Sequence, residues 1–265
     1  MPLHPKAFLL RFLRAVSGLV AMCAVVIVAA PQARADRVHV AVAANFSEVI
    51  DALKPIYKAK TGHELIISVG STGKLYAQIV HGAPFEVLLA ADQARPEKLV
   101  AEGHAVKGSR FTYALGQVVL WSSDPKRISG DPAATLRASD VSAIAIANPT
   151  LAPYGFAAKQ ALERMGLWSE LSSKIATGEN IGQTFSMVAS GNAQLGFVAK
   201  SYALSPRNKE PGSLWAVPND YYDPIRQDAV LLKAGAANPA AKEFLTFLHG
   251  REARGVIEKY GYALE

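Results

Sequence analysis

Hydrophobic positions in residues 36–265 follow two alternating periods, and this alternation predicts an α/β fold. Short runs rich in β-branched residues predict buried strands, and apolar residues at helical spacing follow each run. Glycines such as Gly62 and Gly82 mark the ends of the predicted helices. Strands that alternate with helices are typical of βαβ units around a parallel sheet. The predicted strands cover 37–44, 63–70, 85–91, 143–148 and 194–201, and the predicted helices cover 45–62, 71–82, 95–103, 154–166, 182–191 and 238–250.

Two longer β-type runs interrupt this alternation. The first long run covers 110–123, the second covers 221–235, and another α/β block lies between them. This arrangement predicts two lobes, with the chain crossing from one lobe to the other and back on two long strands. We expect lobe 1 to contain 36–116 and 227–265, and lobe 2 to contain 117–226. A two-lobed α/β body has a cleft in which a ligand can bind.

The first 35 residues have the layout of a secretory signal peptide. A basic start precedes the apolar run 15–30 and a small-x-small motif at 33–35, which predicts cleavage after Ala35 and a periplasmic location. The alternative is an uncleaved anchor helix, but the apolar run is shorter than the roughly 20 residues that span a membrane. The chain's one cysteine, Cys23, lies in this segment, so the mature chain has no disulfide. A bacterial periplasm fits, because a core of this size needs no covalent cross-link.

Removal of the signal peptide also changes the charge. The full chain has 28 Lys and Arg residues against 22 acidic residues, a formal net charge of +6. The signal peptide contains four of the basic residues and none of the acidic ones, which leaves 24 against 22 and a net charge of about +2. The remaining basic residues are scattered rather than clustered on one helix, so we expect no nucleic-acid partner.

The stretch 67–82 resembles a phosphate-binding P-loop, because a predicted strand leads through G-S-T-G-K into a predicted helix. The complete motif needs a glycine five residues before Gly73 and a Ser or Thr directly after Lys74. Those positions hold Ser68 and Leu75, so the nucleotide-binding interpretation fails at two defining places. The shape itself, a helix start with unpaired N–H groups and a positive dipole end, still favours anions.

Other catalytic motifs are missing. The six histidines form no HExxH pair, no G-x-S-x-G elbow is present, and no G-x-G-x-x-G follows a strand. We therefore expect no metal site, no cofactor and no enzymatic activity, and we favour a binding protein. The enzyme alternative is an exported hydrolase with Ser71 or Thr72 as nucleophile and a histidine as base. A ligand-sensing domain of a regulator is disfavoured by the export signal and by the lack of a DNA-binding segment.

Four segments deliver small polar residues to a predicted helix start. Two belong to lobe 1 and two to lobe 2, so one ligand in the cleft can contact both lobes. Helix capping alone explains any one of these segments, because Asn, Ser and Thr favour N-cap positions. The segments are 43–47, 70–73, 152–155 and 178–182.

Five stretches, which include these segments, follow one another in a characteristic order and spacing. They are VAVAANFSEVIDAL, SVGSTGKLYAQIVHGAPFEVLLAADQARPEKL, ANPTLAPYGFAAKQALERMGLW, GENIGQTFSMVASGNAQLGFVAKS and FLTFLHGREARGVIEKYGY. In these stretches, and over essentially its whole length, the mature chain resembles the periplasmic molybdate-binding proteins, the solute receptors of molybdate ABC importers. The resemblance implies a type II periplasmic binding fold, two-lobed, each lobe a mixed sheet flanked by helices. It also implies a monomer that closes on one tetrahedral oxyanion, molybdate or tungstate, held by neutral donors and delivered to membrane permease and ATPase subunits.

The resemblance also implies the binding residues. Backbone N–H groups donate from the first, third and fourth segments, and whether the Asn45 amide also donates is left open. The second segment contributes Ser71 or Thr72, by its hydroxyl and its backbone N–H, with Thr72 slightly favoured by the alignment. Some members have a ligand tyrosine where this chain has Ala199, and this sequence resembles the members that lack it. The implied ligand-binding residues are Ala44, Asn45, Ser71, Thr72, Tyr154 and Ile181.

Protonation and size distinguish the candidate anions. Molybdate and tungstate carry no proton at neutral pH and suit a site made of donors, whereas phosphate carries a proton that needs an acceptor. Sulfate has the same charge and shorter bonds, so a receptor for another anion such as sulfate is the second binding hypothesis. The nearest candidate cation is Lys74, which a solvated helix face also explains. Glu179 is expected on the exterior of its loop.

Overall fold

The computed structural model describes residues 36–209 and 211–265. The predicted signal peptide and its cleavage site lie outside the described residues. None of the described helices combines the length and the apolar character that crossing a bilayer requires.

The first sheet has five strands in the order β2-β1-β3-β10-β4. The strands β2, β1 and β3 are parallel, and β10 runs antiparallel to both β3 and β4. Alternate residues of β1 enter different cores, since Val40 and Val42 face one side of the sheet and Ala41 faces the other. The bounds are β1 Arg37–Ala43, β2 Glu64–Gly70, β3 Val87–Leu89, β4 Phe111–Gly116 and β10 Ile225–Leu231.

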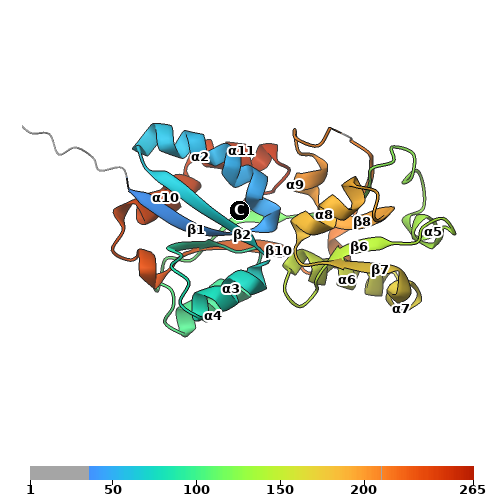
Figure 1. The fold of residues 1–265 in the computed structure, drawn as a ribbon, viewed down its shortest axis with the longest axis horizontal. Helices are drawn as coiled ribbons and strands as arrows, with labels where there is room; N and C mark the ends of the chain where they lie inside the picture. The colour runs from blue at the N-terminus through green and yellow to red at the C-terminus, as the bar shows by residue number, and fades with distance from the viewer. Residues whose placement is uncertain (1–35, 210) are drawn as a thin grey trace, which may run out of the picture. The chain divides into compact units, whose positions relative to one another are not determined.

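Helices cover both faces of this sheet (Figure 1). On one face α2, α10 and α11 pack around Phe46, Tyr57 and Phe244, and on the other α3 and α4 pack through Leu75 and Leu99. The bounds are α2 Ser47–Thr61, α3 Thr72–Val80, α4 Ala94–Ala101, α10 Pro239–His249 and α11 Arg251–Lys259, with the 3-10 helices η1 Ala44–Phe46 and η4 Lys233–Gly235.

The second sheet repeats this plan in the order β7-β6-β8-β5-β9. The strands β7, β6 and β8 are parallel, and β5 is antiparallel to β8 and β9. Two mixed sheets flanked by helices confirm the predicted two-lobed α/β fold. The bounds are β5 Val118–Ser122, β6 Ile144–Ala147, β7 Ile175–Gly178, β8 Leu195–Ala199 and β9 Ser213–Ala216.

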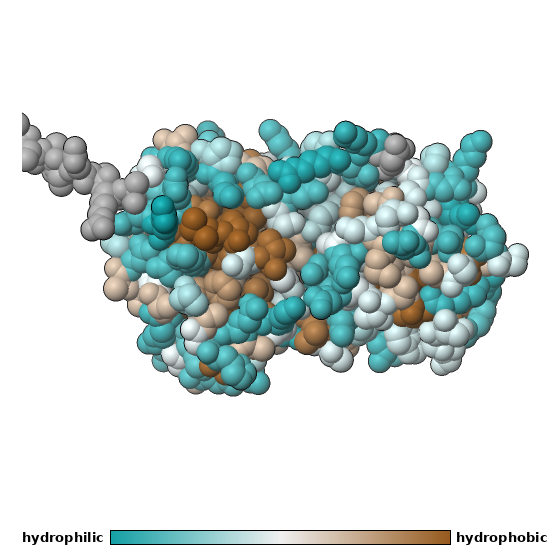
Figure 2. Space-filling view, viewed as in Figure 1, coloured by the Kyte–Doolittle hydropathy of each residue, from teal (hydrophilic) through white to brown (hydrophobic). Residues whose placement is uncertain are grey.

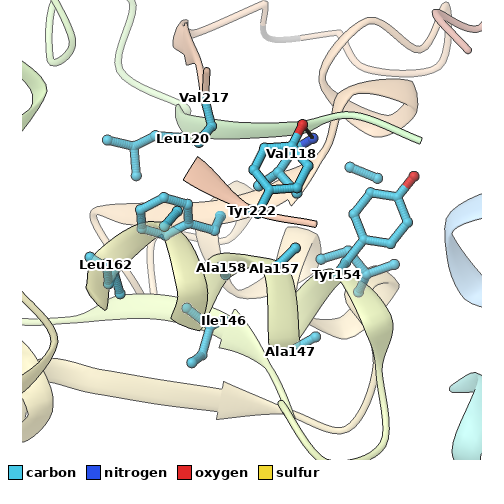
Figure 3. Packing of buried hydrophobic residues seen from close by; sticks show 14 of the residues in the cluster. Val118, Leu120, Ile146, Ala147, Tyr154, Ala157, Ala158, Leu162, Val217 and Tyr222 are labelled. Atoms are coloured by element: carbon cyan, nitrogen blue, oxygen red, sulfur yellow. Dashed lines mark hydrogen bonds between the residues drawn. The ribbon is translucent and has the colours of Figure 1, made fainter. Parts of the chain in front are cut away.

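The core of the second lobe lies between its sheet and α6. In Figure 3, Ala157 and Ala158 of α6 lie close to Ile146 of the sheet, and the Tyr222 hydroxyl accepts a 3.3 Å hydrogen bond from the Val118 N–H. The opposite face is covered by α8 and α9. The bounds are α5 Pro132–Arg137, α6 Pro153–Arg164, α7 Trp168–Leu171, α8 Ile181–Ala189 and α9 Lys200–Ala203, with η2 Ser172–Lys174 and η3 Asn219–Tyr221.

Two connections join the sheets, which belong to one compact unit. The first long run is two strands of different sheets, because β4 ends at Gly116 and β5 begins at Val118. The second connection runs from the end of β9 at Ala216 back to the first sheet. The second long run pairs with that sheet only from Ile225, the first residue of β10. The chain therefore passes between the sheets within the first long run and just before β10 in the second. Each strand hydrogen-bonds within one sheet, and the crossings fall between strands.

The edge strand β2 exposes apolar side chains. Ile66 is 38% exposed and Val69 is 51% exposed. Figure 2 shows a hydrophobic area on this part of the surface.

Candidate anion-binding site

The four predicted helix-start segments meet around one small cavity. All six predicted binding residues line it, and each is at most 4% exposed. Within the part of the chain that the structure describes, no charged side chain lines this cavity. The lining residues are Ala43, Ala44, Asn45, Ser71, Thr72, Ala91, Ala152, Pro153, Tyr154, Asn180 and Ile181.

In α6, the local sequence frees one N–H group for a ligand. The Ala152 N–H donates to the Asn148 carbonyl at 2.8 Å, and the Gly155 N–H donates to the Ala152 carbonyl at 2.9 Å. Pro153 has no N–H to satisfy. Among the described residues, the Tyr154 N–H is thus the donor of this first turn without a protein acceptor, since no intrahelical carbonyl is available to it. The positive end of the helix dipole lies at the same place and favours an anion.

In α8, capping and ligand binding use different N–H groups. The Asn180 side-chain oxygen accepts from Gly182 at 2.9 Å and from Gln183 at 3.1 Å. The first helical residue, Ile181, lies outside this cap, and its N–H remains as a donor beside the cavity. The Asn180 side chain therefore caps α8, as the capping explanation expects. The cap does not use the Ile181 N–H, which is left for the predicted hydrogen bond to a ligand.

The two adjacent hydroxyls of the second segment have different environments. The Thr72 hydroxyl accepts a 3.0 Å hydrogen bond from the Ala91 N–H and so fastens the residues that follow β3. The Ser71 hydroxyl is buried without a hydrogen-bond partner in the described structure, and it does not cap α3. A buried hydroxyl without a partner is costly, and a bound anion would supply the acceptor. The geometry therefore favours Ser71 over Thr72, opposite to the slight preference of the alignment.

The Asn45 amide is already fully used within the protein. Its nitrogen donates to Gln227 Oε1 at 2.7 Å and to the Tyr262 hydroxyl at 3.0 Å, which uses both hydrogens. The alternative in which this amide donates to a ligand is therefore disfavoured. At this position the backbone N–H groups of Ala44 and Asn45, at the start of η1, are the donors that remain.

Comparison with known proteins identifies the family. Residues 38–263 match the family model described as bacterial extracellular solute-binding protein. The chain is 48% identical over 249 residues to the molybdate-binding protein ModA of Rhodobacter capsulatus, and the match covers 94% of this chain and 96% of that protein. The chain belongs to the periplasmic molybdate-binding protein family.

Two further comparisons concern Azotobacter vinelandii. Its molybdate-binding protein ModA is 48% identical over 233 residues, 88% of this chain and 92% of that protein. The solved structure of the Azotobacter vinelandii periplasmic molybdate-binding protein superimposes with a TM-score of 0.82 at 41% identity, covering 86% of this chain and 99% of that chain. Family membership thus extends over both lobes.

Several contacts that hold the first binding segment carry no local sequence motif and so are not predictable from the sequence. Behind the cavity, the Tyr202 hydroxyl donates to the Ala44 carbonyl at 2.6 Å, and the Ser201 hydroxyl donates to the Asn45 carbonyl at 3.0 Å. These residues come from α9 and hold the first binding segment from the opposite lobe. Tyr202 lies three residues after Ala199, where some family members have a ligand tyrosine.

Burial keeps the nearby phenols neutral. Desolvation raises the pKa of Tyr154 well above its ordinary value, and it raises the pKa of Tyr202 to about 12. At neutral pH both hydroxyls therefore remain protonated and uncharged, so they add no negative charge near a bound dianion.

Two charged side chains, Lys74 and Glu179, lie beside the cavity in a pocket that they share with Ser71 and Asn180. Lys74 Nζ lies 3.4 Å from a carboxylate oxygen of Glu179 in the other lobe, and these side chains are 55% and 69% exposed. An exposed pair of this kind contributes little to stability. Nearby, the Gly73 N–H donates to the Leu151 carbonyl at 2.8 Å, and Arg95 Nη2 donates to the Thr150 carbonyl at 2.9 Å. The two lobes are thus in direct contact around the cavity.

Proposed function

We propose that this protein is a periplasmic receptor that captures molybdate or tungstate between its two lobes and delivers it to the permease and ATPase of an ABC importer. The observation that carries the proposal is the composition of the cavity. Backbone N–H groups from both lobes and the unpartnered Ser71 hydroxyl surround a buried space whose lining side chains carry no charge. The molybdate-binding proteins of this family support the same ligand.

This donor set suits a fully deprotonated dianion. Helix starts present N–H groups and roughly half a positive charge each. Because the donors are neutral, no ion pair between the protein and the anion has to be broken when the lobes separate and the anion leaves. It also offers no carboxylate that could accept a proton from an anion such as hydrogen phosphate, since none lines the cavity in the described residues.

The hydrolase alternative has no support in this geometry. A nucleophilic Ser71 or Thr72 requires a base within hydrogen-bond reach, and no histidine lines the cavity in the part of the chain described. We therefore propose binding rather than catalysis, with no resident metal or cofactor. We also propose a monomer without nucleic-acid partners, a mature chain that starts after Ala35, and lobes formed by 36–116 with 227–265 and by 117–226.

Calorimetric titration of residues 36–265 tests the function. We expect one molybdate, or one tungstate, to bind per chain, and sulfate and phosphate at the same concentrations to produce no heat of binding. A ligand at a hundred times its dissociation constant stabilises the folded state by about 2.7 kcal/mol, so the melting temperature should rise with the first two anions alone. Binding of sulfate as tight as that of molybdate would support the second hypothesis instead.

A further inference from the structure

A completely buried glutamine joins the binding segments of the two lobes. Gln227, at the beginning of β10, has no exposed surface. Its Oε1 accepts hydrogen bonds from the Asn45 amide at 2.7 Å and from the Tyr113 hydroxyl at 3.1 Å. Its Nε2 donates to the Tyr154 hydroxyl at 3.2 Å. One side chain therefore contacts Asn45 of the first lobe and Tyr154 of the second, and both residues line the cavity.

A β-bulge in β4 lies opposite this glutamine. The pairing between β10 and β4 shifts register between Gln227 and Asp228, because these neighbours pair with Ala114 and Thr112 and skip Tyr113. Bulges change the direction in which side chains point and are frequent beside functional sites. Because β10 is an inner strand of a sheet with helices on both faces, Gln227 and Asp228 are both buried, like Ala229, Val230 and Leu231 after them.

The hydrogen bond between Gln227 and Tyr154 lies where the chain passes between the lobes. Gly116 ends β4 immediately before the first connection, and it pairs with Ile225 at the end of the second connection. A Cβ atom on Gly116 would clash with the Tyr154 hydroxyl and would lie 2.7 Å from Gln227 Nε2. Glycine at this position leaves the space that the hydrogen bond occupies. We call these two connections the hinge, because rigid lobes joined in this way move about them.

We propose that Gln227 is a positioning residue that fixes the oxyanion-binding segments of both lobes to one point at the hinge. This inference rests on the proposed function. Asn45 and Tyr154 offer backbone N–H groups to the ligand, while their side chains are held by the same amide. Points near a hinge move least when the lobes open, so these two donors stay in place before the anion arrives. Donors that are already ordered reduce the entropic cost of binding.

The experiment compares three single variants by calorimetric titration with molybdate. Gln227→Leu removes all three hydrogen bonds at nearly constant volume, and Tyr154→Phe removes one hydroxyl but keeps the ring and the backbone N–H. Tyr57→Phe is the matched control, because its buried hydroxyl donates to the Ala240 carbonyl at 2.8 Å on the far side of lobe 1. We expect the first two variants to bind molybdate about tenfold more weakly, and the control to melt at a lower temperature with an unchanged dissociation constant.

A double-mutant cycle separates positioning from general stability. If Gln227 acts on Tyr154 directly, combining Gln227→Leu with Tyr154→Phe weakens binding by less than the product of the single effects. Combining Gln227→Leu with Tyr57→Phe should give only the effect of the first change. Unchanged affinity in Gln227→Leu, with only a lower melting temperature, would overturn the inference.

A readout without ligand distinguishes this inference from the proposed function. The Ser47 N–H donates to the Ala44 carbonyl of the segment 43–47, and the Phe156 N–H donates to the Ala152 carbonyl of the segment 152–155 at 3.0 Å. In the ligand-free protein, Gln227→Leu should accelerate hydrogen exchange of both amides, whereas Tyr57→Phe should accelerate neither. Failure of wild-type protein to bind molybdate would reject the proposed function, and unchanged exchange at both amides would reject the role of Gln227.

Discussion

Replacing Ile181 with proline is expected to weaken molybdate binding by about ten- to a hundredfold, because it removes one donor to the anion. A hydrogen bond to a charged group contributes about 1.5–3 kcal/mol. Proline is tolerated at the first helical position. The preceding Asn180 has φ −150° and ψ 172°, an extended conformation that proline accepts in its neighbour. The cap from Asn180 to Gly182 and Gln183 does not involve the deleted N–H. The measurement is calorimetric titration with molybdate.

The control for this change is Ile181→Ala. The Ile181 side chain is 3% exposed and packs in the core of lobe 2, so both variants lose that packing and only proline loses the N–H. We expect alanine to lower the melting temperature and to bind molybdate nearly as tightly as the wild type. Equal affinity of the two variants would show that the Ile181 N–H does not contact the ligand.

Ser71→Ala and Thr72→Val are expected to have opposite consequences for binding and stability. The Ser71 hydroxyl has no partner in the described structure, so its removal should leave the melting temperature of the ligand-free protein unchanged or slightly higher. Molybdate binding should weaken about ten- to a hundredfold. Thr72→Val leaves the Ala91 N–H without its acceptor, which costs about 1–3 kcal/mol of stability. Calorimetry and thermal unfolding of both variants measure the two effects.

This pair also decides between the adjacent hydroxyls. If Thr72→Val loses affinity and Ser71→Ala retains it, then Thr72 is the hydroxyl donor that the alignment favours. Thr72→Ser serves as the control, since it keeps a hydroxyl at position 72 and removes only a methyl group.

Local features of the sequence predicted the parts of the site that depend on neighbouring residues. A helix start needs only a few consecutive residues, so the segments around Ser71, Tyr154 and Ile181 were identifiable from the sequence. The strands rich in valine and isoleucine were predicted for the same reason. Short elements were missed, since four residues such as those of β7 and β9 carry too little periodicity to be distinguished from a loop.

Contacts between distant residues were not predictable from one sequence. Gln227 is 182 residues from Asn45, and Tyr262 is 217 residues from it. Their meeting depends on which sheet each strand joins and on the bulge in β4. The choice between Ser71 and Thr72 likewise depends on Ala91, 19 residues beyond Thr72. Gly116 and Gln117 interrupt the apolar pattern of the first long run only briefly, so the sequence predicts a single strand there.

The most direct test of the central claim is a crystal structure with tungstate, located by its anomalous scattering. The account predicts one tetrahedral anion in the cavity, with its oxygens about 2.7–3.2 Å from the N–H groups of Tyr154 and Ile181 and from the Ser71 hydroxyl. All donors to the anion should be neutral. An anion at the rim beside Lys74, or one held by a charged side chain, would contradict the proposal that neutral helix-start donors from both lobes bind the ligand.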